Sequence, residues 1–114
     1  PSTDETQHLL DAKHLALLPK DAALINAGRG TLLDEDALLN LLNQQHLRFV
    51  LLDVFATEPL PASHPFWQHP AVIITPHVAA DTIPEEAVAQ ISANMQALAS
   101  GHPVQGQVDR QRGY

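Results

Sequence analysis

The sequence predicts an α/β fold in which three strands with flanking helices form about half of a doubly wound parallel sheet. Three observations lead to this prediction. Apolar segments of strand length occupy residues 22–26, 48–54 and 72–75. Helical patterns separate or flank these segments, and the middle segment lacks the alternation of a strand exposed on one face. Strands joined in this order are expected to run parallel, with right-handed crossovers.

The first part of the chain is expected to contain a helix, a strand and a second helix. Ser2 and Glu5 fit a capping box that would start a helix running to about Leu18. Residues 22–26 follow a turn and form the first strand. Asp34 is expected to cap the second helix. The apolar face of that helix consists of Ala37, Leu38, Leu41 and Leu42.

Two further strands are expected in the middle of the chain. Residues 48–54 are apolar without alternation, which indicates a strand in a sheet covered on both faces. A proline-rich stretch then favours an irregular loop with one helical turn near Trp67, and residues 72–75 form the third strand. The prolines of this loop are Pro59, Pro61, Pro65 and Pro70.

A last helix is expected after the third strand. Thr82 and Glu85 fit a second capping box, with Pro84 in the first turn. Gly101 and Pro103 are expected to stop the helix. Its predicted buried face consists of Ala87, Val88, Ile91, Met95 and Leu98.

Composition excludes several classes of protein. The chain has 114 residues, 45% of them hydrophobic, which suits one globular domain or part of one. A formal charge of −7 argues against binding a nucleic-acid backbone. No cysteine is present, no apolar run approaches the roughly 18 residues of a membrane span, and no cluster has the spacing of metal ligands. A cytoplasmic protein without a metal is expected.

Chemically capable residues follow the ends of all three predicted strands. Arg29 follows the first strand, Asp53 and Glu58 end or follow the second, and His77 follows the third. Ligands of open parallel sheets bind outside the carboxyl ends of the strands. We therefore expect an active site in which these four side chains converge.

Each of these residues also has a simpler interpretation. Arg29 could close a turn or pair with Asp34, and Asp53 could cap a turn. Glu58 could be a solvated loop carboxylate, and His77 a structural histidine after a proline. The Gly-x-Gly at residues 28–30 resembles a phosphate-binding loop, but the third glycine of that motif is missing, because Leu33 occupies its place.

Three motifs resemble those of the D-isomer-specific 2-hydroxyacid dehydrogenase family. They are NAGRG at residues 26–30, DVFATEPLP at residues 53–61 and TPHVAA at residues 75–80. The opening residues 1–6 are also similar to the family's turn before a helix. The last residues, 106–114, are most similar to the branch of the family that reduces glyoxylate and hydroxypyruvate.

The resemblance implies a role for each candidate residue. Arg29 would bind the carboxylate of a 2-oxo acid and polarise its ketone. His77 would protonate the developing alkoxide, since an imidazole gains and loses a proton near neutral pH, and Glu58 would orient His77. The family's coenzyme is NADP (as NADPH) or NAD (as NADH). The coenzyme-binding residues implied by the resemblance are Ala27, Gly28, Arg29, Asp53, His77, Ala79 and Ala80, with Asp53 on the carboxamide side of the nicotinamide.

The implied function is reduction of glyoxylate, hydroxypyruvate or a similar small 2-oxo acid by hydride transfer. The resemblance places residues 1–80 in the C-terminal half of a dinucleotide-binding domain, and residues 81–114 in a helix and tail that return to the substrate domain. The chain is then expected to be a fragment that is inactive alone, from an enzyme expected to be a homodimer. The alternatives are a nucleotide-sensing corepressor of the same fold and a non-catalytic binding module.

Overall fold

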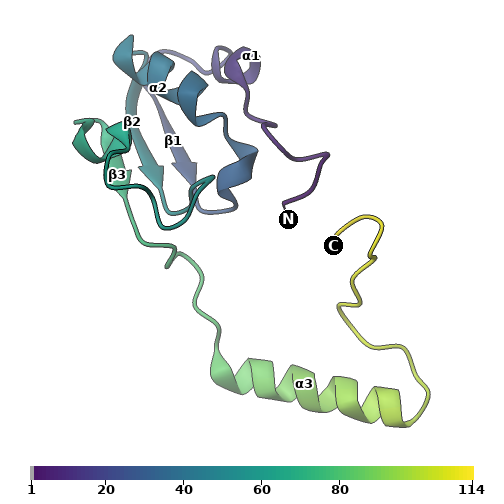
Figure 1. Ribbon diagram of the computed structural model, residues 1–114. Helices are drawn as coiled ribbons and strands as arrows, with labels where there is room; N and C mark the ends of the chain where they lie inside the picture. Colours follow the sequence, from purple (N-terminus) through teal and green to yellow (C-terminus); the bar gives the residue numbers. More distant parts are fainter. Residues whose placement is uncertain (1) are drawn as a thin grey trace. The chain divides into compact units, whose positions relative to one another are not determined.

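The computed structural model describes residues 2–114, so Pro1 of the opening segment lies outside the described residues. The chain forms two compact units, one ending at Ala79 and one running from Ala80 to Tyr114. The first unit contains the sheet, and the second contains the last helix and the tail (Figure 1).

The first unit is built on a parallel sheet of three strands in the order β1-β2-β3. The strands are β1 (Ala22–Asn26), β2 (Leu47–Leu52) and β3 (Val72–Ile74). Asn26 pairs with Leu52 and Leu52 pairs with Ile74, so the three strands end side by side. The predicted fold class and the parallel direction of the strands are confirmed, and each strand lies within two residues of its expected limits.

Helices cover one face of this sheet. Helix α1 (Ala12–Leu15) precedes β1, and α2 (Glu35–Asn43) crosses from β1 to β2. The short 3-10 helices η1 (Gly30–Leu32) and η2 (Pro65–Gln68) complete the connections (Figure 1). The hydrophobic core lies between these helices and the sheet, and it consists of Leu15, Leu33, Leu38, Leu42, Leu47, Val50, Leu52, Phe55 and Phe66.

The first helix is much shorter than expected, and the capping box of Ser2 and Glu5 is wrong. Asp11 is the N-cap of α1 and accepts a hydrogen bond from the His14 amide. Upstream, Thr3 and Thr6 bond to each other through backbone and hydroxyl groups, which competes with helix formation. The chain then pairs with the segment after η1, through an isolated bridge between Leu10 and Leu33.

The expectation that both faces of the sheet are covered is wrong for the described residues. Leu24, Val50 and Val72 form a row against the core, because side chains alternate between the faces of a strand. On the opposite face Ile25 is 62% exposed and Ile73 is 49% exposed. The apolar character of the strands therefore includes a face that these residues leave open.

Two local predictions in the connections are confirmed. Asp34 caps α2, accepting a hydrogen bond from the Ala37 amide at 3.0 Å. The expected helical turn near Trp67 is η2, which begins with a proline. Phe66 from this turn is buried in the core, whereas Trp67 is 52% exposed and donates from its indole nitrogen to the Pro61 carbonyl.

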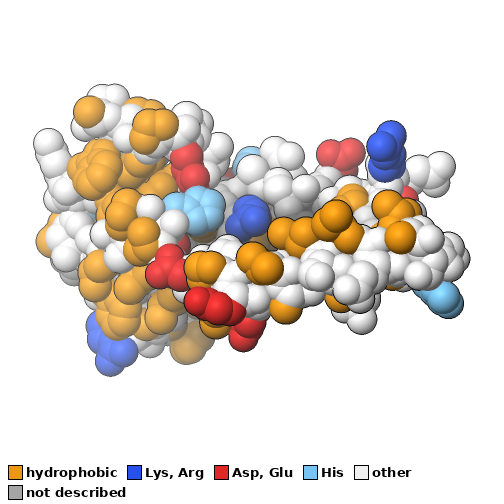
Figure 2. Space-filling model, turned by 90° about the horizontal axis from the view of Figure 1, so that it is seen from below, with side chains coloured by type: hydrophobic (Ala, Val, Ile, Leu, Met, Phe, Trp, Pro, Cys, Tyr) orange, Lys and Arg blue, Asp and Glu red, His pale blue; other side chains and the backbone are white. Residues whose placement is uncertain are grey.

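The second unit is built on α3 (Pro84–Ala99). Pro84 begins the helix as predicted, but the capping box is wrong, because the N-cap is Ile83 and no side chain caps the helix. The predicted buried face is also wrong in this chain, since no residue of α3 is buried. Figure 2 shows hydrophobic side chains exposed on the face of the molecule in view. Its exposed apolar residues include Val88, Ile91, Met95 and Leu98. No helix within residues 2–114 combines the length and apolar character needed to cross a membrane.

Candidate active site

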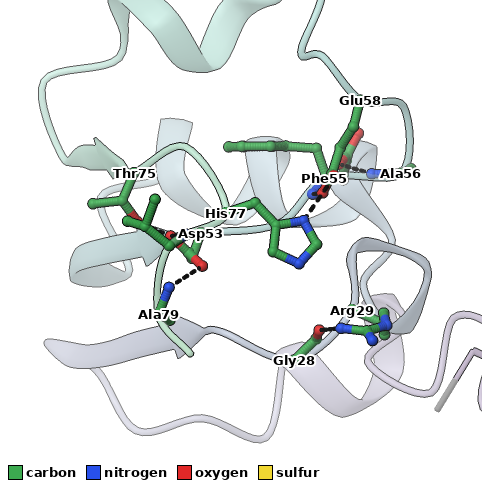
Figure 3. Close-up of polar contacts among 11 residues, drawn as sticks. Gly28, Arg29, Asp53, Phe55, Ala56, Glu58, Thr75, His77 and Ala79 are labelled. Carbon is green, nitrogen blue, oxygen red and sulfur yellow. Dashed lines mark hydrogen bonds and ion pairs between the residues drawn. The ribbon is translucent and has the colours of Figure 1, made fainter. Parts of the chain in front are cut away.

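The candidate site lies at the carboxyl ends of the three strands. The strand register brings these ends together, and the loops that follow them carry Arg29, Asp53, Glu58 and His77. Figure 3 shows these side chains and their polar contacts in one region of the first unit.

Glu58 and His77 form a hydrogen-bonded pair. The His77 Nδ1 lies 2.8 Å from the Glu58 Oε2, and the other carboxylate oxygen accepts from the Phe55 amide at 3.0 Å. An imidazole that donates from Nδ1 keeps Nε2 available for a second partner. The contact implied by the family resemblance is therefore present, across 19 residues of sequence.

The surroundings of Glu58 favour its charged form. The pKa of the Glu58 carboxyl lies below its ordinary value, first because of the hydrogen bond with His77 and second because of the Phe55 amide. The charges of His77 and Arg29 lower this pKa further, while partial burial opposes them. Glu58 is thus an anion that can orient the ring of His77.

His77 has an unusual backbone conformation. Its φ of 56° lies in the left-handed region, which costs a residue other than glycine about 1–3 kcal/mol and persists only where the surroundings enforce it. Asp53 supplies that enforcement. Its carboxylate accepts from the Val78 amide at 3.0 Å and from the Ala79 amide at 2.9 Å, and Thr75 donates its hydroxyl to the same group.

Asp53 is 1% exposed, and the contacts of its carboxylate lie within the 75–79 loop (Figure 3). They match the simpler interpretation of this residue, an aspartate that organises a turn. The Thr75 hydroxyl is the main cause that lowers the pKa of Asp53, followed by the Val78 amide. The fold therefore favours the carboxylate over the carboxylic acid.

A pH dependence of stability follows from this lowered pKa. A carboxyl whose pKa is lower in the folded state stabilises the fold above its unfolded pKa, and this contribution is lost as the pH falls. Asp53→Asn is therefore expected to lower the midpoint of urea unfolding at pH 7. The difference from the wild type should shrink below about pH 4. Asp36→Asn, at an exposed position, is the control, and an Asp53→Asn effect of constant size down to pH 2 would contradict this role.

Arg29 lies on a turn that is shaped by Asn26. The buried Asn26 donates its side-chain amide to the Arg29 carbonyl at 3.1 Å and accepts from the Gly28 amide at 3.1 Å. The exposed guanidinium of Arg29 donates to the Gly28 carbonyl at 2.8 Å. The alternative pairing with Asp34 is absent from the described contacts, since Asp34 caps α2.

Gly30 brings the Arg29 turn against the loop that carries Glu58. A Cβ at Gly30 would lie 1.9 Å from the carbonyl carbon of Phe55, a distance that no side chain can accept. Only glycine allows the two loops to pack this closely. The glycine that suggested a phosphate loop therefore has a packing role here.

A pocket of about 450 Å³ adjoins the Glu58–His77 pair, within the usual range for small-molecule sites. Asp53, Glu58 and His77 line this pocket. Arg29 does not line it and lies on a separate turn. The lining residues are Asp53, Phe55, Glu58, Pro59, Leu60, Trp67, Ile74, Thr75, Pro76 and His77.

Small residues occupy the positions where contact with a coenzyme ring is expected. Ala27, Gly28 and Ala79 are exposed residues of the first unit. Ala80 is also exposed and begins the second unit. Within residues 2–114 no group of histidine, cysteine and carboxylate side chains is arranged to hold a metal ion.

Two residues that shape the site were not predicted from the sequence. Asn26 closes the Arg29 turn, and Thr75 anchors Asp53. Asparagine at a strand end is a signal for such a side-chain turn. The Thr75 contact had no local signal, because its partner lies 22 residues away.

An open parallel sheet with a hydrogen-bonded glutamate–histidine pair and an arginine in the loops at its carboxyl edge fits a ligand-binding α/β domain. The family described as D-isomer specific 2-hydroxyacid dehydrogenase, NAD binding domain, matches residues 1–79. This chain belongs to that family.

The similar proteins come from several bacteria. A glyoxylate/hydroxypyruvate reductase A from Serratia proteamaculans is 51% identical over 114 residues, which are 100% of this chain and 36% of that protein. The chain therefore spans about a third of the length of this curated relative. A D-isomer specific 2-hydroxyacid dehydrogenase from Xanthobacter autotrophicus, solved with NADPH and MES, has a TM-score of 0.94 and 45% identity. The match covers 100% of this chain and 47% of that one.

A second solved structure is also similar over the whole chain. It is an NADPH-dependent glyoxylate/hydroxypyruvate reductase from Sinorhizobium meliloti, in complex with NADP and sulfate. Its TM-score is 0.90 at 34% identity, and the match covers 100% of this chain and 38% of that one.

Proposed function

We propose that this chain supplies the acid–base pair and the substrate-binding arginine of an enzyme that reduces glyoxylate, hydroxypyruvate or a similar small 2-oxo acid. The observation that carries the proposal is the 2.8 Å contact between His77 and Glu58 at the carboxyl edge of the sheet. The similarity of the chain to reductases of this specificity supports the substrate class.

The proposed coenzyme is NADPH or NADH. Ala27, Gly28 and Ala79 are small and exposed, which supports the approach of a flat ring once the Arg29 guanidinium has left the Gly28 carbonyl. When bound, the reduced nicotinamide supplies the hydride. Direct contacts of Asp53 and Ala80 with the coenzyme remain predictions, and Asp53 acts at least through the loop it holds.

In the proposed reaction, the guanidinium of Arg29 leaves the Gly28 carbonyl and forms a bidentate pair of hydrogen bonds with the carboxylate of the 2-oxo acid. The same group polarises the ketone oxygen. A bound coenzyme would supply the hydride to the ketone carbon and become oxidised, and His77 would transfer its proton to the ketone oxygen, which gives the 2-hydroxy acid. Glu58 stabilises and orients the protonated ring of His77.

The remaining parts of the proposal concern the whole protein. We assign residues 1–80 to the coenzyme-binding domain and residues 81–114 to a segment that returns to the substrate domain. The exposed apolar residues of α3 and the open sheet face support further protein packing against them. We also propose, from the family resemblance, that the protein is a cytoplasmic homodimer that binds neither nucleic acid nor membrane. The charge of −7 agrees with the absence of nucleic-acid binding.

A coenzyme oxidation assay tests the proposed function. The full-length protein is expected to oxidise NADPH or NADH, followed at 340 nm, when glyoxylate or hydroxypyruvate is added. The 114-residue chain alone is expected to be inactive. Coenzyme binding by the full-length protein without reduction of any 2-oxo acid would favour the corepressor-like alternative instead.

A further inference from the structure

We propose that Glu35 is a positioning residue for the Glu58–His77 pair, because it fixes the loop that carries Glu58. The inference rests on the proposed function, in which Glu58 orients His77. Nothing in the motifs of the family resemblance assigns a role to Glu35, which lies at the start of α2 rather than at the end of a strand.

The side chain of Glu35 joins three parts of the chain. Glu35 is the first residue of α2, and its side chain is 17% exposed. Its Oε1 accepts from the Ala56 amide at 2.9 Å, and its Oε2 lies 3.6 Å from the His64 Nε2. His64 in turn accepts from the Phe66 amide through Nδ1, at the start of η2. Since Nδ1 is an acceptor, Nε2 carries the hydrogen that faces Glu35.

The Ala56 amide lies beside the amide that Glu58 uses. Glu58 accepts from the Phe55 amide and Glu35 accepts from the Ala56 amide, so two successive backbone amides are each held by a carboxylate. One carboxylate belongs to the loop itself and the other belongs to α2. The buried Gly30 packs against the same two residues from the side of the Arg29 turn.

These contacts leave the loop little freedom. Without Glu35 the Ala56 amide loses its carboxylate acceptor, and residues 55–58 are held by the buried Phe55, the packing of Gly30 and the Glu58 carboxylate. Glu58 would then have to hold both its own loop and the His77 ring. A displacement of about 1 Å at a reacting group can lower a rate about 100-fold, so the Glu35 contact is expected to affect catalysis.

A second explanation for Glu35 is general support of the helix. Glu35 and Asp36 are both acidic residues in the first turn of α2, where a negative charge favours the helix dipole. Asp36 is exposed, while Glu35 bonds to the Glu58 loop. Asp36→Ala therefore removes the same charge from the same turn without touching the loop, and is the matched control.

The test is a double-mutant cycle in the full-length protein, with kcat and both KM values measured for hydroxypyruvate and NADPH. Glu35→Ala is expected to lower kcat about 10- to 100-fold with the KM for NADPH nearly unchanged. Asp36→Ala should keep kcat within about twofold. Glu35→Gln should restore most of kcat, since its carbonyl oxygen can still accept from the Ala56 amide.

The cycle then asks whether Glu35 acts through Glu58. In a Glu58→Gln background, adding Glu35→Ala should change kcat by less than about twofold, because coupled residues are not additive. The inference would be overturned if the losses of kcat from Glu35→Ala and Glu58→Gln were fully additive in the double variant. Equal losses of kcat for Asp36→Ala and Glu35→Ala would also overturn it. A large loss for Glu58→Gln with none for Glu35→Ala would overturn the inference alone. No loss for Glu58→Gln would overturn the proposed role of Glu58 and the inference with it.

Discussion

His77→Asn in the full-length protein is expected to lower kcat for 2-oxo acid reduction by about 100- to 10,000-fold, the range for loss of a general acid. Asparagine suits this test because it tolerates the left-handed backbone found at His77 better than alanine does. The loss should fall on kcat, while the dissociation constant of NADPH, measured by fluorescence or calorimetry, should stay within a few-fold.

The control for this variant is His102→Ala, at an exposed histidine in the tail after α3. It is expected to keep the wild-type kcat. If His77→Asn reduces both glyoxylate and hydroxypyruvate at near wild-type rates, His77 is not the acid in this reaction. The hydrogen bond between His77 and Glu58 would then have only a structural role.

Arg29→Ala is expected to produce the second large effect, a loss of about 100- to 1,000-fold in kcat/KM for the 2-oxo acid. The positive charge of the guanidinium is one of the influences that lower the pKa of Glu58. Arg29→Lys keeps the positive charge but cannot form bidentate hydrogen bonds with the carboxylate, so its kcat/KM should lie between those of the wild type and Arg29→Ala.

The matched control for the arginine is Arg48→Ala. Arg48 lies near the start of β2, at the end of the sheet opposite the site, and stacks over the Phe49 ring at 5.4 Å. Its removal changes the net charge equally. Equal losses for Arg48→Ala and Arg29→Ala would mean that the general field of the protein, and not a bound carboxylate, explains the effect.

The sheet could be predicted because its signals are local. Strand-length apolar segments and the turns between them indicated β1, β2 and β3 within one or two residues. The first helix could not be predicted, since the hydrogen bonds of Thr3 and Thr6 and the distant pairing of Leu10 with Leu33 decide that segment. The exposed faces of α3 and of the sheet carry apolar residues in the same pattern as buried faces, so their exposure could not be predicted from the sequence.

The site shows the same division. Because parallel strands in register end together, the strand ends predicted that the candidate side chains would converge, and the family resemblance implied that Glu58 would contact His77. The left-handed backbone of His77 and the role of Asp53 in holding it depend on bonds that span about 25 residues, for which no local pattern exists. The same holds for Glu35, whose contact with Ala56 spans 21 residues.

The most direct test of the account is a crystal structure of the full-length protein with NADPH and oxamate, whose amide carbonyl replaces the ketone of a 2-oxo acid. We expect the Arg29 guanidinium on the oxamate carboxylate, and the His77 Nε2 within hydrogen-bond distance of the amide oxygen, with Glu58 still on Nδ1. Oxamate bound away from His77, with Arg29 still on the Gly28 carbonyl, would contradict the account.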